Sequence, residues 1–234
     1  MFGWKSAERK TPRRMMDATG AYDGGATGVM TGIVGTTRVA TSMGWREVSA
    51  LQAGDMVLTF DGGLQRVAKV TRRALWTGEG RCPERFWPLL VPAGAIDNAV
   101  PILVLPRQGV MLESDIAEAV LGDPFALIPA AALEGVRGVE RVYPNDPIEV
   151  VILNFEADQV IFAEHGALLF CPAGGDLFQM ALQGATRLCP YEMLPETCAV
   201  ELALSADARA ECHSCLEALR AFRDERAAGF MAVA

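Results

Sequence analysis

Two cysteines three positions apart, Cys212 and Cys215, enclose His213 and have the spacing that most directly suggests chemistry. A Cys-x-x-Cys pair suits tetrahedral zinc coordination or a reversible redox pair. A zinc site needs two more ligands, and only Cys189 and Cys198 are candidates for them. The alternative is packing, because both thiols of the pair continue an apolar helical stripe on which a free cysteine behaves as a small hydrophobe. We therefore keep a metal or redox module as one hypothesis beside a purely structural role.

Three hydroxyl groups form the second candidate set. Thr31, Thr36 and Thr37 lie just before the first alternating strand pattern. A hydroxyl is a weak nucleophile unless a base lies beside it. The chain has only two histidines, and His165 is the candidate base. These four residues are kept as candidates for nucleophilic chemistry.

Composition and charge exclude several other functions. The chain has a formal net charge of −8, although residues 1–14 hold five basic residues and one acidic residue. An acidic body repels phosphate backbones, so we expect no nucleic-acid partner. No apolar run approaches the roughly 18 residues of a membrane span, and the basic first residues are not followed by the apolar segment of a secretory signal. We therefore expect a cytoplasmic protein whose six cysteines are reduced thiols.

Short alternating runs between glycine turns predict a mainly β fold. Residues 37–48 predict a hairpin around Ser42-Met43-Gly44, and residues 51–55 predict a corner that leads into a further strand. Residues 147–165 predict another hairpin, whose two β-branched runs meet at Glu156-Ala157. Strands of this length and spacing indicate a β sandwich or a barrel-like body.

The chain divides into three predicted parts. Residues 1–31 lack a strand or helix period and predict a flexible N-terminal arm, and residues 32–200 predict the β domain. Residues 201–234 predict a helical extension, with Ser205 as the cap of an amphipathic helix. Its apolar stripe comprises Ala208, Cys212, Cys215, Leu219 and Phe222. This stripe is expected to cover the β domain or to pair with a second copy, which would give a homo-oligomer.

Residues 36–70, "TTRVATSMGWREVSALQAGDMVLTFDGGLQRVAKV", resemble the opening of a Hint (Hedgehog/intein) domain of the bacterial stand-alone kind. The family pattern Val-x-x-Leu-x-x-Gly-Asp-x-Val-x-Thr is matched at Val48, Leu51, Gly54, Asp55, Val57 and Thr59. Further along, "PILVLPRQGVML" and "VILNFEADQVIFAEHGALLFCPAG" are similar to the middle and late blocks of that family. The resemblance covers the chain from Gly32 to Gly175 and implies the intein-like β fold.

Hint chemistry, as the resemblance implies it, is an acyl shift. A cysteine or serine at the first position attacks the preceding carbonyl, and a middle-block histidine activates that peptide bond. In this sequence these two places fall on Gly32 and Gln108, and a further histidine place falls on Asp158. None of the three can act as the nucleophile or as the neutral-pH proton carrier that its place requires. The first hypothesis is therefore a degenerate Hint-like domain that acts as a binding or structural module, without a cofactor and with a protein partner. The alternative is residual autoprocessing by an acyl shift, with Thr31, Thr36 or Thr37 as the nucleophile and His165 as the base.

Overall fold

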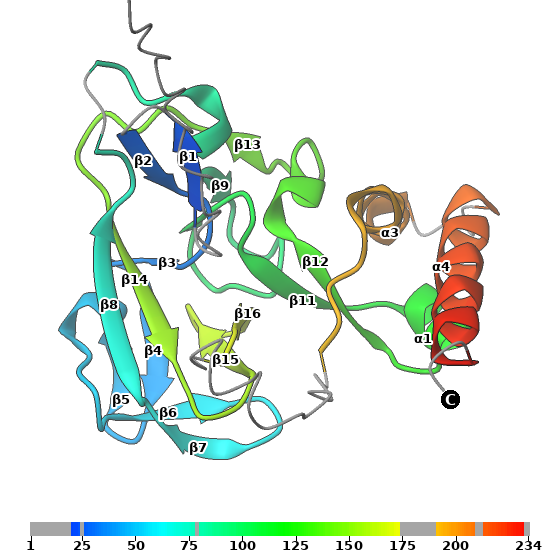
Figure 1. Cartoon of the computed structure of the whole chain (residues 1–234), viewed down its shortest axis with the longest axis horizontal. Coiled ribbons are helices and arrows are strands. Elements are labelled where there is room, and N and C mark those ends of the chain that lie inside the picture. Colours follow the sequence, from blue (N-terminus) through cyan, green and yellow to red (C-terminus); the bar gives the residue numbers. More distant parts are fainter. Residues whose placement is uncertain (1–19, 24–25, 78–79, 174–190, 209–212, 232–234) are drawn as a thin grey trace, which may run out of the picture.

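Two antiparallel sheets make up most of the computed structural model, which describes residues 20–23, 26–77, 80–173, 191–208 and 213–231 (Figure 1). The six-stranded sheet has the order β13 (Glu140–Arg141), β9 (Leu89–Val91), β10 (Ile102–Val104), β3 (Ile33–Val34), β14 (Glu149–Asn154) and β8 (Lys69–Ala74). The eight-stranded sheet has the order β12 (Phe125–Pro129), β11 (Gly109–Glu113), β16 (Ala167–Cys171), β15 (Gln159–Ala163), β4 (Arg38–Thr41), β6 (Met56–Thr59) and β7 (Gly63–Arg66), and β5 (Gly44–Glu47) pairs with β4. The predicted mainly β fold is confirmed.

The corner at residues 51–55 shows why the chain turns where it does. Leu51 is completely buried, and Gly54 has a φ of +100°, which glycine adopts at low cost. The carboxylate of Asp55 accepts a hydrogen bond from the backbone N–H of Gln52 at 2.9 Å. These contacts hold the turn that directs the chain into β6, as the sequence pattern predicts.

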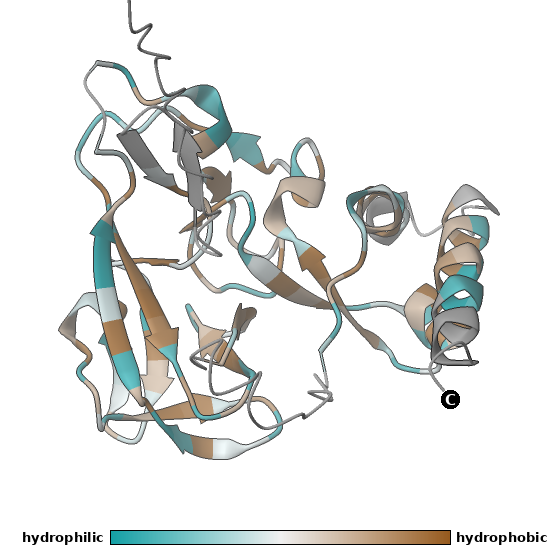
Figure 2. Cartoon of the chain, viewed as in Figure 1, coloured by the Kyte–Doolittle hydropathy of each residue, from teal (hydrophilic) through white to brown (hydrophobic). Residues whose placement is uncertain are grey.

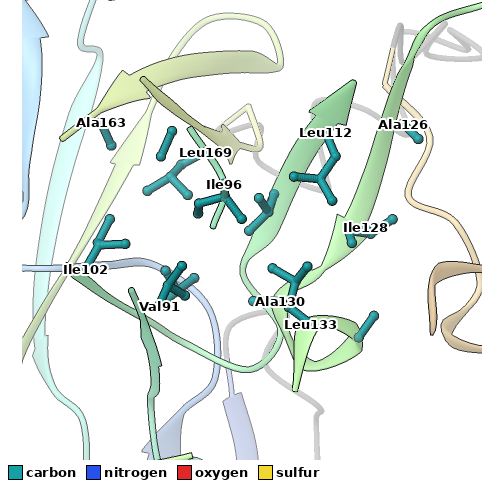
Figure 3. Close-up of a cluster of buried hydrophobic side chains, with 14 of the residues drawn as sticks. Val91, Ile96, Ile102, Leu112, Ala126, Ile128, Ala130, Leu133, Ala163 and Leu169 are labelled. Carbon is teal, nitrogen blue, oxygen red and sulfur yellow. The ribbon is translucent and has the colours of Figure 1, made fainter. Parts of the chain in front are cut away.

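The main core lies between the two sheets. Figure 3 shows Val91 and Ile102 of the six-stranded sheet in one cluster with Leu112, Ile128 and Leu169 of the eight-stranded sheet. Each of these side chains is at most 8% exposed. Because burial of an aliphatic side chain contributes about 1.5–3 kcal/mol, this cluster is a principal source of stability.

Strand β14 is buried on both of its faces. Val150 belongs to one apolar cluster, whereas Val151 and Leu153 belong to the main core. Figure 2 accordingly shows β14 as largely hydrophobic, whereas the neighbouring edge strand β8 mixes hydrophilic and hydrophobic residues. An apolar run without alternation is typical of a strand covered on both sides.

The predicted hairpin of residues 147–165 is wrong. Its two runs form β14 and β15, but these strands belong to different sheets and do not pair with each other. Phe155, just after β14, is 2% exposed and packs in the core. The segment that connects β14 with β15 therefore passes through the core as it leaves one sheet for the other. Two adjacent strand patterns do not reveal which sheet each strand joins, because a strand's place depends on what packs against each of its two faces.

Residues 20–29 of the predicted arm contain two strands that the sequence analysis did not predict. β1 (Gly20–Asp23) and β2 (Ala26–Val29) form an antiparallel hairpin. Val29 is 4% exposed and packs with Leu75 and Val150. The Gly- and Thr-rich sequence has no strand pattern that would predict this hairpin, since its pairing is stabilised by contacts with distant strands. Residues 1–19 of the predicted arm lie outside the described residues.

Three α-helices lie together on one side of the sheets (Figure 1): α1 (Asp115–Leu121), α3 (Glu196–Ala208) and α4 (His213–Met231). The predicted start of the C-terminal helix at Ser205 is wrong, because Ser205 lies inside α3 and its hydroxyl donates to Leu202 O at 2.7 Å. The earlier helix buries Cys198, Ala199, Leu202 and Ala203. That spacing is helical and was the overlooked signal.

The predicted stripe of the C-terminal helix is confirmed at three of its positions. Cys215 and Leu219 of α4 are completely buried, and Phe222 is partly buried against the main core. α4 packs against α1 and α3. The stripe therefore packs against the chain's own core at these positions. Across the described residues, no helix combines the length and the apolar character needed to cross a membrane.

Candidate functional site

The backbone of Gly32 and the side chain of Gln108 meet where the first strand of the six-stranded sheet begins. Gly32 directly precedes β3, and Gln108 directly precedes β11. The Gln108 Oε1 atom accepts a hydrogen bond from the backbone N–H of Gly32 at 2.9 Å. The resemblance aligns these two residues with the nucleophile and the histidine that activates its peptide bond. The structure thus brings these two residues into direct contact.

The amide of Gln108 is fully engaged in backbone contacts. Its Nε2 atom donates to Phe170 O at 2.6 Å and to Gly109 O at 3.1 Å, and the residue is 2% exposed. Neither nitrogen nor oxygen of a carboxamide exchanges protons near neutral pH. Gln108 therefore holds three backbone groups in place and has no capacity for acid–base catalysis.

Gly32 occupies a place with no room for a side chain. Its φ is +118°, a conformation that L-residues rarely adopt. A Cβ atom on Gly32 would lie 2.7 Å from Val150 Cγ1 and 3.3 Å from Val151 O. The position usually held by the nucleophile is thus closed by the packing of β14 as well as chemically empty.

A pocket of about 300 Å³ adjoins this contact. Its walls include Thr31, Gly32, Gln108, Phe170 and Cys171, together with apolar residues of β14. Cys171 is 3% exposed, and burial raises the pKa of its thiol to about 12. A nucleophilic cysteine needs a lowered pKa, so this thiol is a packing group.

We expect the Cys171 thiol to be inert in the folded protein. At pH 8 its alkylation by iodoacetamide should be at least about a hundredfold slower than in the urea-unfolded chain, because the folded thiol is almost wholly protonated. Since the folded pKa of about 12 lies above the ordinary 9.0, the thiol's contribution to stability is complete below pH 9 and is lost as the pH rises toward 12. Peptide mass mapping measures the labelling. Equal rates in folded and unfolded protein would contradict this burial.

Asp158, the third aligned position, has a structural partner. It directly precedes β15 and is 7% exposed. Its Oδ1 atom accepts a hydrogen bond from Ala173 N at 2.7 Å. Asp158 is not among the described residues that line the pocket. The carboxylate therefore holds the chain that leaves β16.

The structure separates the residues of the autoprocessing hypothesis. Thr31 lines the pocket beside Gly32, whereas Thr36 is exposed and lines a different pocket, and Thr37 is 3% exposed. His165 lies in the turn between β15 and β16 and its ring packs on Trp45, with centroids 4.2 Å apart. In the described part of the chain, no hydrogen bond joins His165 to any of the three threonines. A paired hydroxyl and imidazole is not formed there.

The cysteines of the metal hypothesis are only partly described. Cys198 and Cys215 are buried in the contact between α3 and α4, and the Cys198 thiol lies 3.5 Å from Ala218 O. Cys189 and Cys212 lie outside the described residues. Within the described ranges, no group of three or more potential ligand residues could hold a metal ion. The two described thiols therefore behave as core residues.

The residues that precede Gly32 are part of the fold, which sequence reasoning missed. Val29 N donates to Leu75 O at 2.9 Å, and Arg107 N donates to Met30 O at 2.8 Å. In a self-cleaving domain, the acyl shift releases the segment that precedes the first residue of the domain. Here that segment contributes a buried side chain, Val29, and backbone hydrogen bonds to the body.

Comparison with known proteins identifies the fold and its family. The Hint domain model matches residues 32–168, which is more than half of the chain. The chain belongs to the Hint domain family. A comparison with curated protein sequences found no match.

Solved structures with similar folds are inteins and intein-like domains. A bacterial intein-like domain from Clostridium thermocellum is 13% identical, with a TM-score of 0.44, and the match covers 60% of this chain and 99% of that one. The gp41-1 intein is 15% identical, with a TM-score of 0.37 and coverage of 60% and 98%. The MchDnaB-1 intein is 15% identical, with a TM-score of 0.36 and coverage of 58% and 98%. The family assignment rests on the match to the domain model.

Proposed function

We propose that this protein is a catalytically inactive Hint domain that acts as a binding and structural module. The observation that carries the proposal is the contact between Gly32 and Gln108. At the two positions that the resemblance assigns to the nucleophile and to its activating histidine, this contact joins a residue without a side chain to an amide that does not titrate near neutral pH. A protein partner and a cytoplasmic location are part of the proposal.

The closed space at Gly32 supports the same conclusion. Loss of a nucleophile alone could be compensated by a nearby hydroxyl, but Val150 fills the volume that an attacking side chain would need. The upstream hairpin adds a second argument, because cleavage before Gly32 would remove Val29 from its apolar cluster. Because the segment before Gly32 packs against the body, the fold is more stable when the peptide bond before Gly32 stays uncleaved.

Intact-mass measurement tests the proposal. After purification and prolonged incubation with dithiothreitol or hydroxylamine, we expect one species at 25.1 kDa. Both reagents intercept thioester or ester intermediates, so they accelerate cleavage wherever an acyl shift occurs. An active intein incubated in parallel shows that the conditions detect cleavage.

Fragments that break between about residues 30 and 37 and accumulate with time would refute the proposal. In that case His165→Ala separates the two explanations. Loss of cleavage in this variant would identify the threonine–histidine autoprocessing reaction, and unchanged cleavage would exclude His165 as the base. His165 is exposed but its ring packs on Trp45, so the melting temperature of this variant is compared with that of the unaltered protein.

A further inference from the structure

The pocket of about 300 Å³ at the candidate site lies between the two sheets and is lined chiefly by apolar groups. Ile33 of β3 and Val151 of β14 line it from the six-stranded sheet, and Phe170 of β16 lines it from the eight-stranded sheet (Figure 1). Its walls also include the flexible thioethers of Met30 and Met193, which can adjust to the shape of a ligand. The pocket has the size and the apolar lining of a site for a small molecule.

Arg107 is the only charged residue among the described residues that line this pocket. Its side chain is exposed, and within the part of the chain that the structure describes its guanidinium has no hydrogen bond and no ion pair. The chain carries 29 acidic residues against 21 basic ones, so an arginine without a carboxylate partner is unexpected. The positive charge of Arg107 is therefore available to an anion that enters the pocket.

The backbone holds Arg107 close to a second polar residue of the pocket wall, Thr31. Arg107 N donates to Met30 O at 2.8 Å, and Gly32 N donates to Gln108 Oε1 at 2.9 Å. These two bonds tie the segment before β3 to the segment before β11, and both segments line the pocket. As far as the structure describes the chain, the Thr31 hydroxyl has no hydrogen-bond partner either. The pocket wall thus presents a cation and a hydroxyl on two connected segments.

The other polar side chains of the pocket are already engaged or neutral. The Gln108 amide binds three backbone groups, and the buried Cys171 thiol is protonated. A guanidinium suits a carboxylate in particular, because it can donate two parallel hydrogen bonds to the two carboxylate oxygens. A threonine hydroxyl can donate a further bond. Apolar walls next to these donors indicate a ligand that combines a carboxylate with an apolar body.

We infer that this pocket binds a medium-chain aliphatic carboxylic acid. The carboxylate contacts Arg107 and Thr31, and the hydrocarbon chain lies between the two sheets. This inference adds a small-molecule ligand to the proposed binding role and rests on that role. Ligand binding and backbone cleavage are measured separately, so their failures are distinguishable. An uncleaved chain that does not bind the acid contradicts this inference alone, whereas time-dependent cleavage contradicts the proposed function.

Isothermal titration calorimetry of the full chain with sodium octanoate tests the inference. We expect saturable binding with a Kd on the order of 100 µM, as a ligand of this size can reach. Octanamide has nearly the same shape without the charge and should bind at least about fivefold more weakly, because the charge-assisted hydrogen bonds are lost. Butyrate keeps the carboxylate and should bind at least about tenfold more weakly than octanoate, because its shorter chain buries fewer methylene groups.

A pair of matched variants assigns the charge to one residue. Arg107→Gln should weaken octanoate binding at least about fivefold, because glutamine keeps a polar side chain but loses the charge and the paired donors. Arg66→Gln removes the same charge at an exposed position that is not among the described residues of the pocket wall. It should weaken binding less than about twofold, because a distant surface charge is screened by salt.

Three results would each overturn the inference: no saturable binding of octanoate, equal affinity for octanoate and octanamide, or equal affinity of the Arg107→Gln and Arg66→Gln variants for octanoate. The melting temperatures of both variants are measured beside that of the unaltered protein, and we expect them to agree because both side chains are exposed. The comparison of octanoate with octanamide and butyrate uses the unaltered protein, so it decides the question independently of how the variants fold.

Discussion

Replacing Gly32 by alanine is expected to lower the free energy of unfolding by about 4 kcal/mol and the melting temperature by about 10 °C. Two costs add at this position. The φ of +118° is strained for any residue with a Cβ atom, and the new methyl group would lie 2.7 Å from Val150 Cγ1 and 3.3 Å from the carbonyl oxygen of Val151. Thermal and urea unfolding monitored by circular dichroism measure both quantities.

Gly44→Ala is the matched control for this variant. Gly44 has a φ of +90°, but a Cβ atom there meets nothing within 4 Å. It therefore carries the backbone cost alone, which we expect to be about 1–2 kcal/mol. Equal destabilisation by the two variants would show that the packing around Gly32 is loose, and the argument for a closed nucleophile position would then fail.

Replacing Gln108 by leucine should destabilise the protein by about 4 kcal/mol. Leucine has a similar size but lacks both polar atoms, so Gly32 N–H, Gly109 C=O and Phe170 C=O all lose a hydrogen-bond partner. Each buried backbone group left without its partner costs about 1–3 kcal/mol. Urea unfolding measures the loss. Hydrogen exchange of the Gly32 amide should also become faster in this variant.

Gln52→Leu controls for the change of side-chain type. Gln52 is exposed, so this variant should alter stability by less than about 0.5 kcal/mol. A small effect of Gln108→Leu, similar to that of the control, would mean that the Gln108 contacts are replaced by water. The site would then be open to solvent and to a small reactant, contrary to the proposal.

These two predictions connect stability with the proposed loss of catalysis. In an active domain, the group at the place of Gln108 must change its protonation state, and the residue at the place of Gly32 must carry a reactive atom. Here both positions hold the backbone of the first strand. In the proposed inactive module, Gly32 and Gln108 therefore keep a structural role in place of a catalytic one.

Local pattern was sufficient for the features that depend on neighbouring residues. The β4–β5 hairpin and the corner at Leu51–Asp55 could be predicted, because turn geometry and strand alternation are encoded within a few residues. The same applies to the stripe of Cys215 and Leu219, which the structure buries. Gly32 and Gln108 were singled out by the resemblance to the Hint family.

Only the tertiary structure decided which strands share a sheet and which surfaces meet. The runs around Val151 and Ile161 read as one hairpin, yet burial of β14 on both faces places them in different sheets. The β1–β2 hairpin depends on contacts with segments far away in sequence. The closure at Gly32 does as well, since it is made by Val150, more than a hundred residues later. Sequence determined the chemical types at the site, and long-range packing determined the space around them.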